Sequence, residues 1–298
     1  MLKKESLIWT LFIILTITVA ACGNGNDNGS YERSSIQDSL DNLNPNKKED
    51  AKILYGREIF NHTDTAVPEN VGNKLSCISC HGDDGLDANS PMVGVNVTYP
   101  KMHHGKYTTL AERVNGCMVR SMNGQKFKED SKELDAVVSF LDFISKDVNS
   151  KKDVTWRMDN NMEKTPEPDI TRGAELFDRK NCISCHATDG SGTGNETGPA
   201  LWGENSFNDA AGMARFSKAA GYIQNNMPRG LENTLTDQEA ADLAAFMLSH
   251  ERPVADKSEV GTYHLNPGRD YITKERRKKI RDKTFDWESL DSVKKAKQ

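Results

Sequence analysis

Two five-residue segments of this 298-residue chain have the same sequence, Cys-Ile-Ser-Cys-His, at positions 77–81 and 182–186. In a Cys-x-x-Cys-His segment, one turn of helix presents two thiols to the two vinyl groups of one haem, and the histidine reaches the haem iron from the same side. The sequence therefore predicts two covalently bound c-type haems. The expected attachment and proximal-ligand residues are Cys77, Cys80, His81, Cys182, Cys185 and His186.

Two other interpretations of the cysteine pairs explain less of the pattern. A thioredoxin-like redox pair occurs in a βαβ context, and no run of β-branched residues surrounds either segment. A zinc site built from both pairs would collect four thiolates, but it would leave the histidine that follows each pair without a role. The haem interpretation accounts for the cysteines and the histidines together.

Each haem iron also needs a ligand on its other side. After the second segment, the candidates are Met213, Met227 and Met247. Residues 225–228, Asn-Asn-Met-Pro, resemble the loop that presents the distal methionine in many cytochromes c, so we favour Met227. Met247 fits a core position on a final helix. Histidine–methionine ligation gives a relatively high reduction potential, which suits onward electron transfer.

After the first segment, no methionine loop occurs at the corresponding place. Arg113, Cys117 and Ser121 instead follow one another at intervals of four residues, which places a cation, a thiol and a hydroxyl on one face of a helix. Gly116 would let the helix backbone approach a flat partner closely. These side chains indicate a site; the structural alternatives are a buried small residue for Cys117 and ordinary surface groups for Arg113 and Ser121.

Two capping boxes predict where helices begin. Thr109 is followed three residues later by Glu112, and Thr236 is followed in the same way by Glu239. In such a box the two residues exchange hydrogen bonds between side chain and backbone and satisfy the free N–H groups of the first helical turn. The first box predicts the helix that carries the cation, thiol and hydroxyl, and the second predicts the closing helix of the second repeat.

The two haem segments belong to an internal repeat. Residues 55–60, Tyr-Gly-Arg-Glu-Ile-Phe, precede the first segment, and residues 172–177, Arg-Gly-Ala-Glu-Leu-Phe, precede the second. Each is expected to form the first helix of a cytochrome c domain. Apolar residues with a 3.6-residue period at 134–141 and 240–247 predict a closing helix for each copy. The predicted fold is mostly α, with two tandem cytochrome c domains that each bind one haem.

Composition divides the rest of the chain. The stretch after residue 22 has too few apolar groups to fold alone, and the polar stretch between the repeats contains Pro166 and Pro168. The basic run at 274–281 indicates a solvated face, with docking of an acidic electron-transfer partner or of lipid headgroups as the alternative. The expected segments are a lipoprotein signal peptide 1–21, a flexible tether 22–50, a first cytochrome c domain 51–148, a linker 149–169, a second cytochrome c domain 170–255 and a charged C-terminal tail 256–298.

The N-terminus predicts export. Lys3 and Lys4 precede a largely apolar run at 7–21 that is too short for an ordinary membrane span, a pattern typical of a secretory signal peptide. Residues 19–22, Val-Ala-Ala-Cys, resemble the lipobox of bacterial lipoproteins, so Cys22 is expected to carry the lipid anchor. We therefore expect an exported lipoprotein, anchored to a bacterial membrane on its extracytoplasmic side, either in the periplasm or at the cell surface.

Composition also excludes two classes of protein. After the N-terminus, no run reaches the ~18 apolar residues that a membrane span needs, which excludes a multi-spanning protein. The formal net charge is -5 and the pI is about 5.9, unlike the basic surface of a nucleic-acid-binding protein.

Residues 113–117, Arg-Val-Asn-Gly-Cys, and residues 120–124, Arg-Ser-Met-Asn-Gly, resemble the signature of di-haem thiosulfate dehydrogenases, which also act as tetrathionate reductases. The resemblance covers residues 51 to about 255. The roles that it implies are Cys117 as distal ligand of the active-site haem opposite His81, Arg113 and Ser121 in the substrate pocket, and Met227 as ligand of the electron-transfer haem.

The chain departs from that family in two places. At residues 99–104 a Tyr-Pro pair is followed by Lys-Met-His-His, where family members commonly have an arginine shortly after the Tyr-Pro. The anion pocket would then rely on His103 or Lys106. The residue before Met227, sometimes lysine in the family, is Asn226 here, so a lysine-to-methionine ligand switch at the second haem is not expected.

The resemblance implies that the chain interconverts thiosulfate and tetrathionate. Joining two thiosulfate ions releases two electrons, and two haems can each hold one. A thiolate on iron lowers the haem potential, and the sulfur of Cys117 is also a nucleophile that can form a sulfur–sulfur bond with substrate. Arg113 would bind sulfonate oxygens. The electrons would pass to a soluble or membrane-bound electron-transfer protein such as a small cytochrome c.

Other function classes remain open at this stage. If Cys117 is only structural, the chain could be a non-enzymatic di-haem electron carrier or a subunit of a larger respiratory complex. It could also resemble the di-haem subunit of the sulfur-oxidising (Sox) complex. That subunit typically has cysteine ligation at its second haem, where this chain has Met227.

Overall fold

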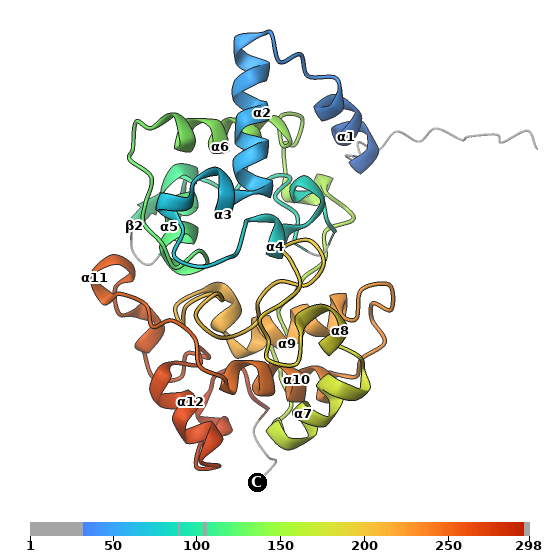
Figure 1. Cartoon of the computed structure of the whole chain (residues 1–298), viewed down its shortest axis with the longest axis vertical. Helices are drawn as coiled ribbons and strands as arrows, with labels where there is room; N and C mark the ends of the chain where they lie inside the picture. Colours follow the sequence, from blue (N-terminus) through green and yellow to red (C-terminus); the bar gives the residue numbers. More distant parts are fainter. Residues whose placement is uncertain (1–31, 89, 104–105, 295–298) are drawn as a thin grey trace, which may run out of the picture.

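The computed structural model describes residues 32–88, 90–103 and 106–294, apart from the side chain of His103, and these residues form two helical lobes along the long axis of the molecule (Figure 1). The predicted signal peptide and Cys22 lie outside the described residues. The first lobe contains α1 (Arg33–Asp41), α2 (Lys48–Asn61), α3 (Thr63–Ala66), η1 (Pro68–Asn70), α4 (Ile78–His81), η2 (Asp83–Gly85), α5 (Leu110–Arg120), α6 (Lys132–Phe143) and a hairpin of β1 (Lys101–His103) with β2 (Lys106–Thr108).

The second lobe follows in chain order. Its elements are η3 (Lys151–Asp153), α7 (Ile170–Arg179), α8 (Ile183–His186), η4 (Gly212–Ala214), α9 (Phe216–Asn226), α10 (Asp237–Ser249), α11 (Lys257–Val260), η5 (Tyr263–Leu265), α12 (Lys274–Arg281) and η6 (Trp287–Ser289). The mostly helical fold predicted from the sequence is confirmed. Among the described residues, no helix is both long and apolar enough to span a bilayer.

In each lobe, the helix that precedes the haem segment crosses the closing helix of the repeat at a glycine. A Cβ on Gly56 of α2 would lie 2.0 Å from the carbonyl oxygen of Ala136 on α6. A Cβ on Gly173 of α7 would lie 2.2 Å from the carbonyl oxygen of Asp242 on α10. Only a residue without a side chain lets these helices approach so closely. Each copy of the sequence repeat therefore makes the same helix–helix contact. It packs α2 on α6 in the first lobe and α7 on α10 in the second.

Both predicted capping boxes are confirmed. The Thr109 hydroxyl accepts from the Glu112 N–H at 3.1 Å, and the Thr109 N–H donates to the Glu112 carboxylate at 2.8 Å. The corresponding distances for Thr236 and Glu239 are 3.2 and 3.0 Å. Because these bonds satisfy the first N–H groups of α5 and α10, both helices begin where the sequence predicts.

The segment predicted to be a flexible tether differs from that prediction after residue 32. It forms α1, whose Ile36 and Leu40 are 3% and 1% exposed and belong to the hydrophobic core. These two side chains are four residues apart and share one helix face, so one turn of apolar surface fixes the helix on the first lobe. The helix α2 then begins at Lys48, ahead of the predicted domain start.

The segment predicted to be a solvated, charged tail also differs, because it folds onto the second lobe. Arg277 of α12 is fully buried; its Nη1 donates to the carbonyl of Ile272 at 3.2 Å and lies 3.6 Å from the carboxylate of Asp209. Apolar residues scattered between the charges form the buried side of this segment: Ile272, Ile280, Trp287, Leu290 and Val293. The segment therefore has a buried apolar side despite its high charge, and one of its charged residues, Arg277, is buried as well.

The predicted linker is ordered by that same C-terminal segment. Thr165 is fully buried; its N–H donates to the carbonyl of Ser292 at 2.8 Å, and the N–H of Lys294 donates to the carbonyl of Thr165 at 2.9 Å. Val154, earlier in the linker, is 3% exposed. The linker is therefore packed against the protein over part of its length.

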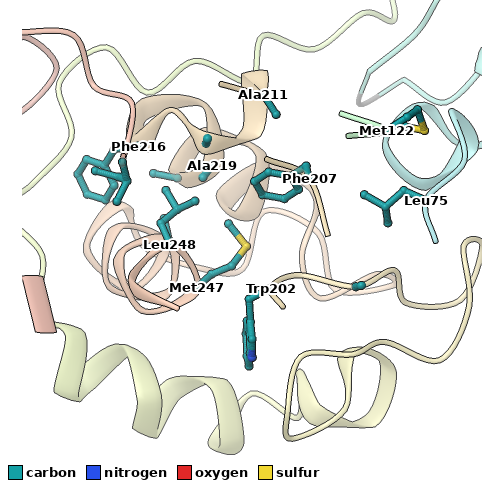
Figure 2. Close-up of a cluster of buried hydrophobic side chains, with 14 of the residues drawn as sticks. Leu75, Met122, Trp202, Phe207, Ala211, Phe216, Ala219, Met247 and Leu248 are labelled. Atoms are coloured by element: carbon teal, nitrogen blue, oxygen red, sulfur yellow. The ribbon is translucent and has the colours of Figure 1, made fainter. Parts of the chain in front are cut away.

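The two lobes share a hydrophobic cluster. Figure 2 shows Leu75 and Met122 of the first lobe beside Phe207 of the second, and all three belong to the same buried cluster. Asn208 fixes the lobes further, since its Nδ2 donates to the carbonyl of Val119 at 2.8 Å and its N–H donates to that of Arg120 at 3.2 Å. The C-terminal end of α5 is thus capped by a residue of the second lobe.

Candidate functional site

The second lobe contains a cavity of about 480 Å³. All the side chains predicted to hold the second haem line it: Cys182, Cys185, His186 and Met227. Met213 and Met247 line it as well. A cavity of several hundred Å³ with mostly apolar walls is typical of cofactor sites. The sequence-predicted residues are therefore brought together around one space, together with the two alternative methionines.

His186 is oriented as a metal ligand would be. It is 8% exposed, and its Nδ1 lies 2.9 Å from the carbonyl oxygen of Pro199. A carbonyl can only accept, so Nδ1 carries the proton and Nε2 has a free lone pair. Burial lowers the pKa of His186, which keeps the ring neutral. These features fit axial ligation of a haem iron.

Met227 lies at the end of α9, where the chain leaves the helix in an extended conformation. Asn226, the residue before it, is 1% exposed and donates from Nδ2 to the carbonyl of Tyr222 at 2.8 Å. Met247 is 4% exposed on α10, as a core residue is. The half-buried position of Met227 at a helix end agrees with the loop pattern of residues 225–228.

The same cavity is partly lined by the first lobe. Its first-lobe residues are Leu75, Ile78, Ser79, Cys80, Gly82 and Asp83, which include one of the predicted attachment cysteines of the first haem. Tyr222 of α9 also lines the cavity. Burial raises the pKa of Tyr222, and Cys80 and Asp87 of the first lobe raise it further. The two predicted haem sites are therefore neighbours across the lobe interface.

In the first lobe, His81 has the same orientation as its counterpart. Its Nδ1 lies 2.7 Å from the carbonyl oxygen of Ser90, and burial lowers its pKa. Burial also raises the pKa of Cys77 to about 12 and that of Cys80 to about 11. Both thiols are thus neutral and lie in apolar surroundings, which fits cysteines that become thioether links to a haem.

Cys117 lies on α5 beside these two thiols. In its ionised form Cys117 would raise the pKa of both Cys77 and Cys80, so the three thiols lie within electrostatic range of one another. The guanidinium of Arg113, one turn earlier on α5, donates from Nη1 to the sulfur of Cys117 at 2.8 Å. Cys117 in turn raises the pKa of Arg113. The predicted cation and thiol are in direct contact, close to the first haem segment.

Ser121, the third predicted side chain, caps the C-terminus of α5. It is half-buried, and its N–H donates to the carbonyl of Cys117 at 2.8 Å. Its own carbonyl accepts from Asn73 at 2.8 Å. The structure therefore places Ser121 one turn beyond Cys117, on the same helix, as the spacing predicts.

Arg120 was not predicted from the sequence as a site residue. A Cβ on Gly116 would lie 2.5 Å from Nη2 of Arg120, so the guanidinium folds back over the glycine. Burial lowers the pKa of Arg120, while Cys117 raises it and Arg113 lowers it. The space predicted for a flat partner above Gly116 is thus occupied by a second arginine beside Cys117. The sequence signal for its place in the site was its position three residues after Cys117 on the same helix.

Two tyrosines from distant segments complete this surrounding. Tyr99 is hydrogen-bonded to Arg113, and the ammonium of Lys101 lies 4.9 Å from the centre of the Tyr99 ring. Burial raises the pKa of Tyr271, from the C-terminal segment, although the positive charges of Arg215 and Arg120 lower it. The electrostatic interaction of Tyr271 with Arg120 does not follow from local sequence, because these residues are far apart in the chain.

Lys106 is not placed where the sequence analysis expected an anion ligand. It lies on β2, its ammonium is paired with Glu112 at 2.7 Å, and its side chain is 77% exposed. The exposed pair lies at the start of α5, beside the capping box. For His103, only the backbone within β1 is described.

Arg157, from the predicted linker, also adjoins the first haem segment. Its two Nη atoms donate to the carbonyls of Pro91 and Val93 at 3.4 and 2.5 Å, and its charge lowers the pKa of His81. Its Nε is buried without a hydrogen-bond partner among the described residues. A buried guanidinium N–H of this kind fits an anionic group, such as a carboxylate of haem, next to His81.

The comparisons with known proteins agree with this division into two sites. Residues 56–149 match the family described as SoxA/TsdA, cytochrome c domain, and residues 170–251 match the family described as Cytochrome c. The two predicted cytochrome c domains are confirmed, and with them two covalently bound c-type haems.

Several curated relatives share most of the chain. Thiosulfate dehydrogenase of Psychrobacter arcticus is 36% identical over 79% of this chain and 74% of the relative. Thiosulfate dehydrogenase of Allochromatium vinosum is 37% identical over 68% of this chain and 78% of the relative. The solved structure of thiosulfate dehydrogenase (TsdBA) from Marichromatium purpuratum, in its as-isolated form, is 34% identical with a TM-score of 0.64, over 72% of this chain. This chain spans 48% of that structure's chain, about half its length.

Proposed function

Because this chain belongs to the thiosulfate dehydrogenase family of di-haem c-type cytochromes, we propose that it joins two thiosulfate ions into tetrathionate at the first haem site and passes the electrons on through the second. The reverse reaction, reduction of tetrathionate, is part of the proposal. The family relationship supports an oxidoreductase, and the geometry around Cys117 supports the location of the chemistry.

The observation that carries this proposal is the contact of 2.8 Å between Arg113 and the sulfur of Cys117. A sulfur atom beside a buried cation suits a substrate that is itself a sulfur nucleophile with a sulfonate group. The planar guanidinium can hold two sulfonate oxygens while the adjacent sulfur reacts. Arg120, three residues after Cys117 on the same helix, supplies a second positive charge for a dianion in a protein whose net charge is -5.

The proposed reaction takes place in two steps at the sulfur of Cys117. The terminal sulfur of a first thiosulfate bonds to the Cys117 thiolate, and two electrons are released as this sulfur–sulfur bond forms. A second thiosulfate then attacks the outer sulfur of that bond, which yields tetrathionate and regenerates the Cys117 thiolate. Arg113 and Arg120 offset the negative charge of each incoming ion, and Ser121 offers a hydroxyl one turn further along α5.

The haems supply one-electron acceptors for the two electrons. We propose that His81 and Cys117 would hold the haem iron at the first site, and that His186 and Met227 would hold it at the second. The histidine assignments are supported by hydrogen bonding. In both His81 and His186 a backbone carbonyl accepts from Nδ1, which leaves Nε2 free to bind iron. The contact between the two sites through Cys80 supports direct electron passage from the first to the second.

We also propose that the chain is exported and lipidated at Cys22, and that a small electron-transfer protein such as a cytochrome c receives the electrons. The N-terminal sequence pattern supports this location, and covalent haem attachment outside the cytoplasm is consistent with it. Expression of residues 22–298 without the leader is expected to give protein lacking haem, whereas the full chain is expected to carry two haems per chain.

A direct assay tests the function. The purified holo-protein is mixed with thiosulfate and ferricyanide, and separately with tetrathionate and a reduced viologen. The proposal predicts turnover that depends on substrate in the first mixture, with tetrathionate as the product. Protein that exchanges electrons with dithionite and ferricyanide but does not consume thiosulfate would be an electron carrier, and the proposed function would be wrong.

A further inference from the structure

An ion pair between Asp87 and Arg229 joins the two lobes across their interface. Nη2 of Arg229, in the second lobe, lies 2.7 Å from Oδ2 of Asp87, in the first. The Asp87 side chain is 13% exposed and the Arg229 side chain is 49% exposed. A half-buried pair of this kind is less screened by solvent than one in which both partners are exposed.

On the first lobe, this pair lies against the residue that follows His81. Gly82 has a φ of 35°, and a Cβ there would lie 2.7 Å from Oδ2 of Asp87 and 3.2 Å from Nη2 of Arg229. The guanidinium of Arg229 therefore covers the backbone directly after a predicted iron ligand. Glycine at this position leaves the room that the ion pair occupies.

On the second lobe, the same arginine belongs to the loop that begins with Met227. The helix α9 ends at Asn226, and Met227 and Arg229 both line the cavity of the second site. The Arg229 guanidinium also donates to the carbonyl of Glu196 at 3.4 Å. Leu231, two residues further on, is 62% exposed. Through Arg229, this loop is attached both to the first lobe and to the segment that follows His186.

We propose that the Asp87–Arg229 ion pair is a positioning device for Met227, so that axial ligation in the second lobe depends on a carboxylate of the first. This inference rests on the ligand assignment made under the proposed function. An ion pair two residues from the methionine limits how far the loop can move from the cavity. The same contact keeps the loop aligned with the segment after His81.

The test measures how readily an external ligand displaces the methionine. Oxidised holo-protein is titrated with imidazole, and the absorption band specific to methionine-ligated ferric haem is followed for the wild type, Asp87→Asn and Arg229→Gln. A partly exposed ion pair contributes ~0.2–1 kcal/mol, so each variant is expected to bind imidazole at the second haem roughly 1.4- to 5-fold more tightly. The double variant is expected to lie close to Arg229→Gln rather than at the sum of the two single effects, because both substitutions break the same Asp87–Arg229 ion pair and Arg229→Gln also removes the bond to Glu196.

Matched variants separate positioning from charge and from folding. Lys126 and Glu259 form another pair between the first lobe and the C-terminal segment, at 2.8 Å, with exposures of 49% and 48%. Glu259→Gln removes the same charge as Asp87→Asn away from the cavity, so its imidazole affinity is expected to equal that of the wild type. Arg229→Lys keeps the charge, so its imidazole affinity is expected to be closer to that of the wild type than the affinity of Arg229→Gln is. Haem content and the helical circular dichroism signal identify any variant that fails to fold.

Two outcomes overturn the inference, and they can be distinguished. If Met227→Leu abolishes the methionine band but Asp87→Asn and Arg229→Gln bind imidazole as the wild type does, the ion pair does not position the ligand. If Met227→Leu leaves the band unchanged, the ligand assignment itself is wrong and the inference fails with it. Neither readout depends on thiosulfate turnover, so failure of the proposed reaction would be seen separately.

Discussion

Arg113 and Cys117, one helical turn apart on α5, are in direct contact, with Nη1 of the arginine 2.8 Å from the sulfur of the cysteine. The interaction joins a permanent cation to a polarisable nucleophile beside the attachment cysteines of the first haem. Under the proposed function, this contact would let one helix both bind an anionic sulfur substrate and react with it.

Replacing Arg113 with Gln is expected to lower kcat/KM for thiosulfate while both haems stay bound. A hydrogen bond to a charged group contributes ~1.5–3 kcal/mol, which corresponds to a decrease of roughly 10- to 100-fold. Steady-state kinetics with ferricyanide measure the change, and Arg33→Gln, at an arginine of α1 whose side chain is 44% exposed, serves as the control. Activity of Arg113→Gln equal to that of the control would remove Arg113 from the substrate site.

Gly116→Ala is expected to raise KM without destabilising the protein. The added Cβ would meet Nη2 of Arg120 at 2.5 Å, and this flexible side chain can move away more easily than backbone can. Alanine also favours the helix by ~1 kcal/mol over glycine. The same rise in KM is expected for Arg120→Gln, since both changes remove the guanidinium from Cys117. A Gly116→Ala variant with normal KM would mean that Arg120 does not contact substrate.

Gly173→Ala is expected to behave differently, although the substitution is the same. Here the added Cβ would lie 2.2 Å from the backbone carbonyl of Asp242, so α7 must shift away from α10. Overpacking of this kind costs about 1–3 kcal/mol, and the midpoint of thermal unfolding is expected to fall by several degrees. Differential scanning calorimetry of Gly173→Ala and Gly116→Ala provides the comparison, and equal midpoints would contradict the crossing contact.

Docking of the C-terminal segment is expected to depend on acid pH through Asp270. Burial alone would raise the pKa of Asp270, but hydrogen bonds from Ser217 and the charge and hydrogen bond of Arg215 hold it below its usual value. Its stabilisation is therefore present above the unfolded pKa of ~3.9 and is lost as pH falls through the lower folded value. Protection of residues 263–293 from hydrogen exchange should fall in that range.

Asp270→Asn is the matched variant for this pH dependence. It is expected to reduce protection of the C-terminal segment at neutral pH and to remove most of the acid-dependent loss. If the wild type and the variant show the same acid profile, a different group controls docking of this segment.

The parts of the fold that could be predicted from sequence are those fixed by local patterns. The haem segments, the capping boxes of α5 and α10, and the spacing from Arg113 to Ser121 each involve residues within a few turns of one another. The similar segments 55–60 and 172–177 correctly indicated repeated domains. The structure adds the role of their shared glycine, because Gly56 and Gly173 each lie in contact with the partner helix.

The parts that could not be predicted depend on long-range packing. Arg229 and Asp87 are separated by 142 residues, and nothing in their local sequence pairs them. The C-terminal segment was predicted to be solvated because charge dominates its composition, yet Ile272 and Ile280 are buried. Arg120 was overlooked since an arginine on a helix usually lies in solvent, whereas Gly116 makes room for it to lie beside Cys117.

The most direct test of the central claim is the rate of thiosulfate oxidation by Cys117→Met. Methionine offers a neutral thioether in place of the thiolate, and Cys77, Cys80 and His81 are unchanged, so two haems per chain are expected to remain bound. The sulfur that bonds the substrate is lost, and the rate is expected to fall by several orders of magnitude. A rate close to that of the wild type, with both haems present, would show that Cys117 is not the reacting group and would contradict the proposed mechanism.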